Sequence, residues 1–364
     1  MVELNQPFSG SYSPEEVSFL MRRMHLETTL LADREKLIQS GQRHYSEMIG
    51  PEDAPTRDRL KLFRESLVSN GPRMAQDLSM LAAGMAASAV NGELTVVSIA
   101  RAGTPIGVLL WHRLREIAPH LRLKHYSISV IRDRGVDYAA LRWIMARHSP
   151  VSLRFVDGWT GKGTIADELR LSIAAWPEAP SDLDSGLWVP LDVCGAATFA
   201  ASSQDYLIPS TLLGGTLSGL VSRSVLPSGE EGGAAFHGCV PLDSLRRYDL
   251  SRWFIRQIQS LMATLPTPES VQNASAGPPR RGETSRCLDL MLARHQLTDR
   301  NRIKLGIGET VRVLLRRLPH TIWLSDRTNP TDADLIRRLA ALRNVPVVTE
   351  PDLAFDAIAV IASV

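Results

Sequence analysis

Apolar positions along the chain follow two patterns, continuous runs typical of buried strands and the spacing typical of helices. Continuous apolar runs predict parallel strands at 94–100, 123–130, 151–156 and 187–191. Helical spacing predicts helices at 56–87, 106–117, 164–176 and 250–265. Ser13, followed by a proline and two glutamates, is a typical helix start and predicts a helical region to about residue 41. This alternation predicts an α/β fold with a doubly wound, mostly parallel sheet.

The C-terminal part repeats the alternation on a smaller scale. It predicts helices at 308–318 and 332–342 and strands at 321–325 and 345–348, followed by a final apolar segment at 358–364. Before it, residues 265–283 are rich in proline, serine and small polar residues, which favours a linker. We therefore divide the chain into a domain at 1–265, a linker at 266–284 and a second, smaller α/β domain at 285–364.

Composition narrows the class of protein. A length of 364 residues suits two domains, and 41 basic against 39 acidic side chains give no strong general attraction to nucleic acid or to anionic membranes. Three cysteines, at positions 194, 239 and 287, are odd in number and widely separated, which argues against disulfides and a Cys-x-x-Cys zinc site. There is no signal peptide pattern and no run of 18 apolar residues. We expect a cytoplasmic protein without membrane contact.

One strand-to-helix turn has the composition of a phosphate site. The strand at 151–156 ends in Asp157, and a loop rich in glycine and threonine then leads into a helix at Thr164. Backbone N–H groups and the positive end of the helix dipole would converge there on an anion. The Walker A pattern fails because Gly163 follows Lys162, and no Gly-x-Gly-x-x-Gly is present. The candidate ligands are Gly158, Thr160, Gly161, Lys162, Gly163 and Thr164, and the alternative is an ordinary glycine-rich turn.

A second such turn follows the strand at 94–100 and contains Arg101, Ala102, Gly103 and Thr104. In this order the two turns resemble the pyrophosphate and ribose-phosphate loops of type I phosphoribosyltransferases. The resemblance implies phosphoribosyl pyrophosphate as substrate, with an unidentified small-molecule acceptor. Arg101 would hold the pyrophosphate, while Asp157 would bind the ribose hydroxyls and Mg²⁺. Gly158 stands where a second acid is expected, so a non-catalytic module that binds a phosphoribosyl ligand is an alternative.

The charged segment 131–138, with Arg132 and Arg134, lies between these two turns. It suits a mobile lid over such a substrate, because the reaction must be shielded from water. A solvated charged loop explains the segment equally well.

The N-terminal part also resembles a bacterial family, the StiP N-terminal domain. The resemblance covers most of residues 10–265 and is carried by both turns and by the segments 44–48, 192–195, 236–239 and 249–252. This family is named for a cysteine protease and occurs with tellurium-resistance, stress-response gene clusters. It implies a second function, a cysteine protease with Cys194 as nucleophile and His237 or His44 as base. A cysteine among glycine and alanine is also typical of a small buried side chain.

Residues 302–317 resemble the Pelota-type RNA-binding domain, which often follows the StiP domain. The resemblance implies contacts with RNA phosphates from Lys304, Gly306, Gly308 and Arg312. Residues 285–364 contain 12 basic and 9 acidic side chains, so this domain is only mildly basic. A scaffold or protein-interaction domain of the same fold is the alternative. Taken together, the sequence favours a phosphoribosyltransferase that uses Mg²⁺, with the protease as the second hypothesis.

Overall fold

The computed structural model describes residues 5–268 and 277–363. Its larger part is built on a six-stranded sheet in which all neighbouring strands are parallel. The strands follow the order β1 (Ser18–Phe19), β4 (Arg122–Ile128), β3 (Glu93–Ile99), β7 (Leu153–Val156), β8 (Leu187–Leu191) and β9 (Phe199–Ser202). The chain continues from β3 to β4 on one side and later returns to β7 on the other. The carboxyl ends of β3 and β7 therefore form the switch point where such sheets bind ligands.

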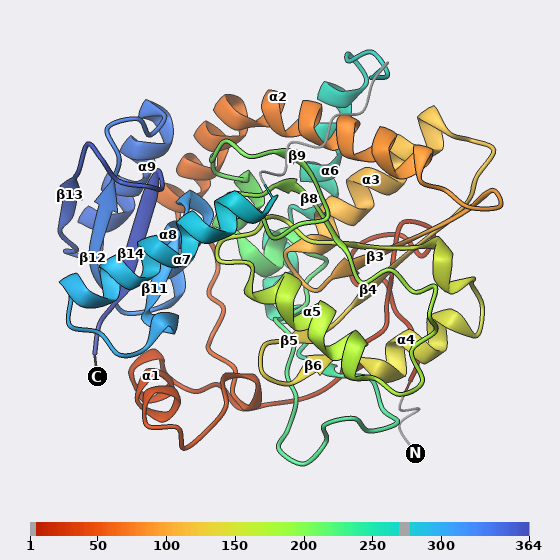
Figure 1. The fold of residues 1–364 in the computed structure, drawn as a ribbon, viewed down its shortest axis with the longest axis horizontal. Coiled ribbons are helices and arrows are strands. Elements are labelled where there is room, and N and C mark those ends of the chain that lie inside the picture. Colours follow the sequence, from red (N-terminus) through yellow and green to blue (C-terminus); the bar gives the residue numbers. More distant parts are fainter. Residues whose placement is uncertain (1–4, 269–276, 364) are drawn as a thin grey trace.

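Helices cover both faces of this sheet. On one face lie α2 (Arg57–Ala87), α3 (Gly103–Ile117) and α6 (Ser251–Met262), and on the other α4 (Tyr138–Met145) and α5 (Thr164–Ala175) (Figure 1). Alternate side chains of β3 point to opposite faces of the sheet, so Val96 is part of one apolar core and Val97 is part of the other. The predicted α/β class with a mostly parallel sheet is confirmed.

The C-terminal part has its own four-stranded sheet. Its order is β11 (Ile303–Leu305), β14 (Ala357–Ile361), β12 (Pro319–Leu324) and β13 (Val347–Thr349), with β14 antiparallel to both neighbours. Three helices accompany it, α7 (Gly277–Arg294), α8 (Ile307–Arg316) and α9 (Pro330–Ala341). Helix α7 begins inside the segment expected to be a linker, and residues 269–276 of that segment lie outside the described residues.

The two parts share one apolar core, in which side chains from α2 and α3 join those of α8, α9 and β14. A buried polar contact also ties them together. The Asn70 side chain donates to Oδ1 of Asp332 over 2.8 Å, and the Leu207 N–H donates to Oδ2 of the same carboxylate over 3.2 Å. Asp332 is fully buried, so both of its carboxylate oxygens are satisfied only while the two parts stay docked.

The helix predicted from Ser13 to about residue 41 is wrong. Ser13 and Glu16 bond each other's backbone N–H groups within a single turn, after which the chain extends into β1 at the sheet edge. Val17 and Phe19 are buried there, so core contacts outweigh the local helix signal. Helix α1 covers only Leu31–Gln39. The remaining short elements are β2 (Arg22–Arg23), β5 (Val130–Ile131), β6 (Gly135–Val136), β10 (Gly238–Cys239) and the 3₁₀ turns η1 (Tyr45–Glu47), η2 (Pro150–Ser152), η3 (Pro209–Leu212), η4 (Gly214–Leu217), η5 (Asp243–Tyr248) and η6 (Arg300–Arg302).

No helix within the described residues is both long enough and apolar enough to cross a membrane.

Candidate functional site

A cavity of about 950 Å³ lies where the carboxyl ends of β3 and β7 face the C-terminal part. Its walls come from α1, the segment 41–53, the turns after β3 and β7, and the stretch from β11 through α8. Twelve arginines and two lysines line it, against six carboxylates, although the whole chain carries a formal charge of only +2. These cations are Arg34, Arg43, Arg59, Arg101, Arg132, Arg134, Lys162, Arg223, Arg302, Lys304, Arg312, Arg316, Arg317 and Arg343. The cavity, henceforth the arginine cavity, is therefore strongly electropositive.

The two turns singled out in the sequence meet at its floor. A Cβ built on Gly103 would lie 2.6 Å from the Val156 carbonyl oxygen, and one built on Gly158 would lie 3.5 Å from the Ala102 carbonyl oxygen. Glycine at position 103 is what allows the strand ends to approach so closely. The expected convergence of the two turns is present.

The side chains of the first turn are already engaged. Arg101 pairs with Glu52 and donates to the Val221 carbonyl over 3.0 Å. The Thr104 hydroxyl is buried and bonds Ser127 at 2.7 Å, so it points away from the cavity.

The second turn surrounds Asp157, which is half-buried. Burial raises the pKa of this carboxyl to about 7, and the Gly158 N–H, which donates to Oδ1 over 2.7 Å, acts in the opposite direction. Arg312 also lowers the pKa of Asp157. Burial lowers the pKa of Lys162 to about 8, and its ammonium donates to the Arg300 carbonyl over 2.7 Å. Near pH 7 both groups lie close to their titration points.

The glycines of this turn are covered by side chains of the C-terminal part. A Cβ on Gly161 would lie 2.7 Å from Cγ of Glu309, and one on Gly163 would collide with the guanidinium of Arg281. Gly163, the residue before α5, also has a φ of +80°, a conformation that favours glycine. The turn thus packs against side chains of the C-terminal part, a contact that its local sequence does not indicate.

The residues expected to contact RNA face the same junction. A Cβ on Gly308 would lie 2.9 Å from the Trp159 ring, and Gly306, at a φ of +90°, lies beside Asp205. The guanidinium of Arg312 pairs with Glu309 at 2.7 Å and lies over the Trp159 ring at 5.7 Å. Lys304 lines the arginine cavity. All four lie against or face the N-terminal part.

Cys194 lies just beneath the cavity floor, in the loop after β8. Oδ1 of Asp192 accepts N–H bonds from Cys194 over 3.0 Å and Gly195 over 2.9 Å, and it also accepts the Thr160 hydroxyl. Burial, reinforced by the Asp192 charge, raises the pKa of the Cys194 thiol to about 12, while the nearby Thr160 hydroxyl lowers it. Thr160 itself lines the cavity. The thiol is close to the cavity but closed to solvent in this form.

The other two cysteines are buried away from the cavity lining. Burial raises the pKa of Cys239, on β10, to about 12 and that of Cys287, on α7, to about 11. Within the described residues no hydrogen bond joins a cysteine to a histidine.

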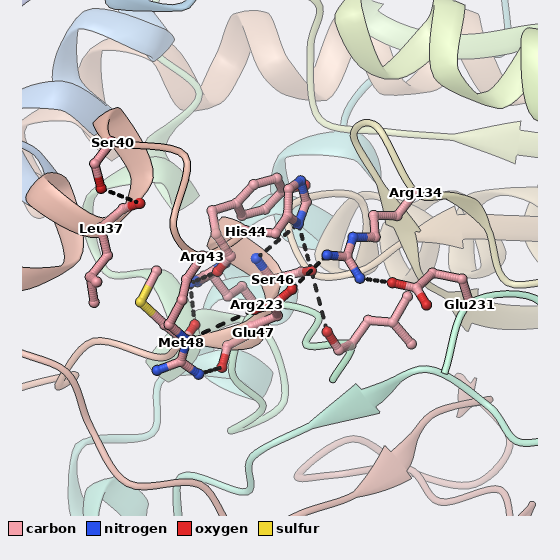
Figure 2. A network of polar contacts seen from close by, with 12 residues as sticks. Leu37, Ser40, Arg43, His44, Ser46, Glu47, Met48, Arg134, Arg223 and Glu231 are labelled. Carbon is pink, nitrogen blue, oxygen red and sulfur yellow. Dashed lines mark hydrogen bonds and ion pairs between the residues drawn. The ribbon is translucent and has the colours of Figure 1, made fainter. Parts of the chain in front are cut away.

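The two candidate bases differ in position. His237 is buried, with Nδ1 at 2.9 Å from the Ser129 hydroxyl, and burial lowers its pKa to about 4. It does not line the arginine cavity. His44 does line it, and Figure 2 shows its ring beside Ser46, whose hydroxyl lies 2.8 Å from Nδ1. The other ring nitrogen, Nε2, is buried without a hydrogen-bond partner among the described residues.

The segment around His44 is held by two arginines from distant parts of the chain (Figure 2). Arg223 donates to the Tyr45 carbonyl over 2.6 Å and to that of Met48, and Arg134 pairs with Glu47 at 2.6 Å. Arg134 also pairs with Glu231. The charged segment 131–138 is therefore bound to this wall of the cavity through the ion pair of Arg134 with Glu47.

Most of the cavity cations were not expected from the sequence. Arg34, Arg59 and Arg223 stand in three separate segments without a recognisable motif. Arg316 and Arg317 are adjacent, at the end of the segment that resembles the Pelota-type domain, and were not among the residues expected to contact RNA. Within the described part of the chain, no three His, Cys, Asp or Glu side chains gather as metal ligands do. Mg²⁺ at Asp157 stays a prediction.

Comparison with known proteins decides the family. Residues 10–259 match the family model described as "Tellurite-like stress resistance cysteine protease StiP", and residues 283–363 match the "PELOTA RNA binding domain". The chain belongs to the StiP family. The curated "Cysteine protease StiP" of Acinetobacter baylyi (strain ATCC 33305 / BD413 / ADP1) is 39% identical over 357 residues, which cover 94% of this chain and 91% of that protein. No solved structure matches the chain. The resemblances to the StiP domain and to the Pelota-type domain are confirmed, whereas the resemblance to type I phosphoribosyltransferases is not.

The predicted phosphoribosyltransferase function is wrong. Both the N-terminal family match and the relative name a cysteine protease, and neither names a phosphoribosyltransferase. The local cause of the error is visible in the site. The glycine-rich turn looked like an anion cradle because it allows close approach, but the groups that approach it are Glu309 and Arg281 of this same chain.

Proposed function

We propose that this chain is a cysteine protease whose nucleophile is Cys194 and whose general base is His44. Membership of the StiP family is the observation that carries the proposal. In the reaction, the Cys194 sulfur attacks the carbonyl carbon of the scissile amide after its proton passes to the imidazole. The C–N bond then breaks, the departing amine takes that proton, and water hydrolyses the thioester.

The position of Cys194 among the three cysteines supports its choice. It follows a strand at the carboxyl edge of the parallel sheet, and the adjacent Thr160 lines the arginine cavity. Cys239 pairs with β2 and Cys287 packs in the shared core. His44 is favoured as base because it lines the cavity, whereas His237 does not. Burial, together with Arg134 and Arg132, lowers the pKa of His44, which keeps the imidazole neutral and able to accept a proton.

The present form is a resting state of such an enzyme. Arg280 on α7 donates to the Val193 carbonyl over 2.9 Å, and its neighbour Arg281 pairs with Asp167 on α5. These two contacts hold the start of α7 against the loop that contains Cys194. A thiol with a raised pKa and no exposure is unreactive, so turnover requires this end of α7 to move away.

Proteolysis of casein and self-cleavage test the proposal. Cys194→Ala should lower the rate at least 100-fold, whereas the matched variants Cys239→Ala and Cys287→Ala should keep at least half of it. His44→Ala should also lose activity. If Cys194→Ala cleaves casein like the parent, the assignment of the nucleophile is refuted. If His237→Ala abolishes activity and His44→Ala does not, the base is His237.

RNA is a second candidate partner, supported by the match of residues 283–363 to an RNA-binding domain. Contacts from Lys304 and Arg312 would require RNA to enter the arginine cavity, because both side chains lie there. Filter binding with single-stranded and hairpin RNA tests this, and Arg312→Gln should weaken binding. The three widely separated free cysteines support a reducing, cytoplasmic location.

A further inference from the structure

The arginine cavity contains cations that form no ion pair with any described residue. The Arg316 guanidinium and the Lys304 ammonium line the cavity, and neither makes a hydrogen bond or an ion pair with any described residue. Nη1 of Arg223 is likewise buried without a partner in the part of the chain that the structure describes. Arg316 and Lys304 are half-buried, so their charged donors are open to a ligand, whereas the buried Nη1 of Arg223 is costly while it has no partner. Their positions suit an anionic ligand.

The anions already present in the cavity are carboxylates. Glu52 pairs with Arg101 and also acts electrostatically on Arg316, and Glu309 stands in the same relation to Arg312 and Lys304. Each of these two carboxylates thus interacts electrostatically with two cations of the cavity. Planar guanidinium groups match carboxylates well.

Apolar side chains line the cavity together with these charges. Ile38, Leu213, Leu245 and Leu315 line the same cavity. A ligand that matches this lining therefore combines several carboxylates with apolar groups. A peptide with acidic side chains has this composition, since its main chain and methylene groups can lie against the apolar lining. A volume of about 950 Å³ stands near the upper end for small-molecule sites, which leaves room for several residues.

The position of the cavity agrees with a substrate site. Its floor includes Thr160, which adjoins the Cys194 thiol. We propose that the arginine cavity is the substrate site of the protease and that it selects peptides with two or more acidic side chains near the cleaved bond. This inference rests on the proposed function.

Binding is tested apart from cleavage, in the Cys194→Ala chain. Fluorescence anisotropy compares a labelled hexapeptide that contains three glutamates with its glutamine counterpart, at 50 and 200 mM NaCl. The glutamate peptide should bind at least tenfold more tightly, and more weakly at high salt. Arg316→Gln and Lys304→Gln should each lower its affinity about tenfold, as expected for a hydrogen bond to a charged group. Arg256→Gln, at an exposed position on α6 outside the cavity, should leave it unchanged.

A pH series adds a second readout. Burial and the nearby cations lower the pKa of Lys304 to about 7. The charged groups that act on it most strongly are Glu309 of α8, Lys162 of the turn after β7, Arg317 and Arg132. A bound carboxylate favours the protonated ammonium, so affinity should fall as the pH rises from 6.5 to 9. Lys304→Gln should flatten this fall.

The outcomes separate the inference from the function beneath it. If the glutamine peptide binds as well as the glutamate peptide, or Arg316→Gln and Lys304→Gln change nothing, the inference is refuted. If an RNA oligonucleotide binds with the same dependence on both residues and the acidic peptide does not, the ligand is nucleic acid and the inference is refuted. If the acidic peptide binds as expected but the parent chain never cleaves it, the site stands and the protease proposal fails.

Discussion

The buried ion pair between α1 and the residue after α8 gives a quantitative test of how the two parts are held together. Glu35 is fully buried, and its carboxylate takes both the Nε and Nη2 donors of Arg317, whose side chain is 30% exposed. Arg34 also lies close enough to feel the Glu35 charge, and it donates to the Arg316 carbonyl over 2.9 Å. One carboxylate therefore serves two guanidinium groups.

The expected losses follow from what each substitution leaves behind. Glu35→Gln leaves Arg34 and Arg317 facing each other without a counter-charge, and breaking a buried pair costs about 3–5 kcal/mol. Arg317 is partly exposed and can be rehydrated, so we expect about 3 kcal/mol. Arg317→Gln leaves the Glu35 carboxylate with Arg34 still beside it, and about 1–2 kcal/mol is expected. The double variant should lose at least 1 kcal/mol less than the sum of the single variants.

Urea unfolding followed by tryptophan fluorescence measures these free energies. The order of the two single variants is the critical result, because it depends on Arg34. If Arg317→Gln costs more than Glu35→Gln, or if the two losses add within 0.5 kcal/mol, the picture of one carboxylate shared by two arginines is refuted. Arg256→Gln, on an exposed face, is the control and should change stability by less than about 0.5 kcal/mol.

Three further results are expected. Asp157 has a pKa of about 7 in the folded chain against 3.8 in the unfolded chain, so the folded chain binds more protons and loses stability as the pH rises through this range. In urea unfolding, Asp157→Asn should therefore be about 1–2 kcal/mol more stable than the parent at pH 8.5 but not at pH 4. Gly163→Ala should lower the free energy of unfolding by about 1–3 kcal/mol, because position 163 has a φ of +80° and the Arg281 guanidinium fills the space beside it. Gly158→Ala has space for the added methyl group and should lower it by less than about 1 kcal/mol. Arg281→Ala removes the partly exposed ion pair with Asp167 and should speed iodoacetamide labelling of Cys194 up to about fivefold. An unchanged rate would argue against the idea that α7 shields the Cys194 thiol.

Local signals in the sequence predicted most of the long elements, although they missed α7, which begins in the segment expected to be a linker. Thr56 was the expected start of a helix, and its hydroxyl accepts the Arg59 N–H over 3.2 Å at the start of α2. The apolar run at 94–100 forms β3. The short elements gave no such signal. Helix α4 has only eight residues, mostly apolar or aromatic, so it lacks a polar face, and β11 has three residues.

Only those site residues that belong to a short, recognisable sequence segment could be predicted. Arg101 and Asp157 lie on strand-to-helix turns, whose composition shows in a short window of sequence, and both line the cavity. Arg34, Arg223 and Arg316 reach the same cavity from segments that are far apart in the chain. No sequence pattern within any one of these segments indicates that the three side chains lie in the same cavity. The same limit explains the wrong activity, because what fills a glycine-rich turn is decided by residues elsewhere.

The carboxylates inside the arginine cavity set a threshold for any ligand that enters it. Glu52 and Glu309 are fixed beside their arginines by the fold, so each competes as if it were present at millimolar concentration or more. A ligand with one carboxylate gains too little to displace them and would occupy only Arg316 or Lys304. A peptide with several acidic side chains can engage both cations at once, and each further contact forms within one complex. Charge density of the ligand, more than total anion concentration, should therefore decide what this cavity binds.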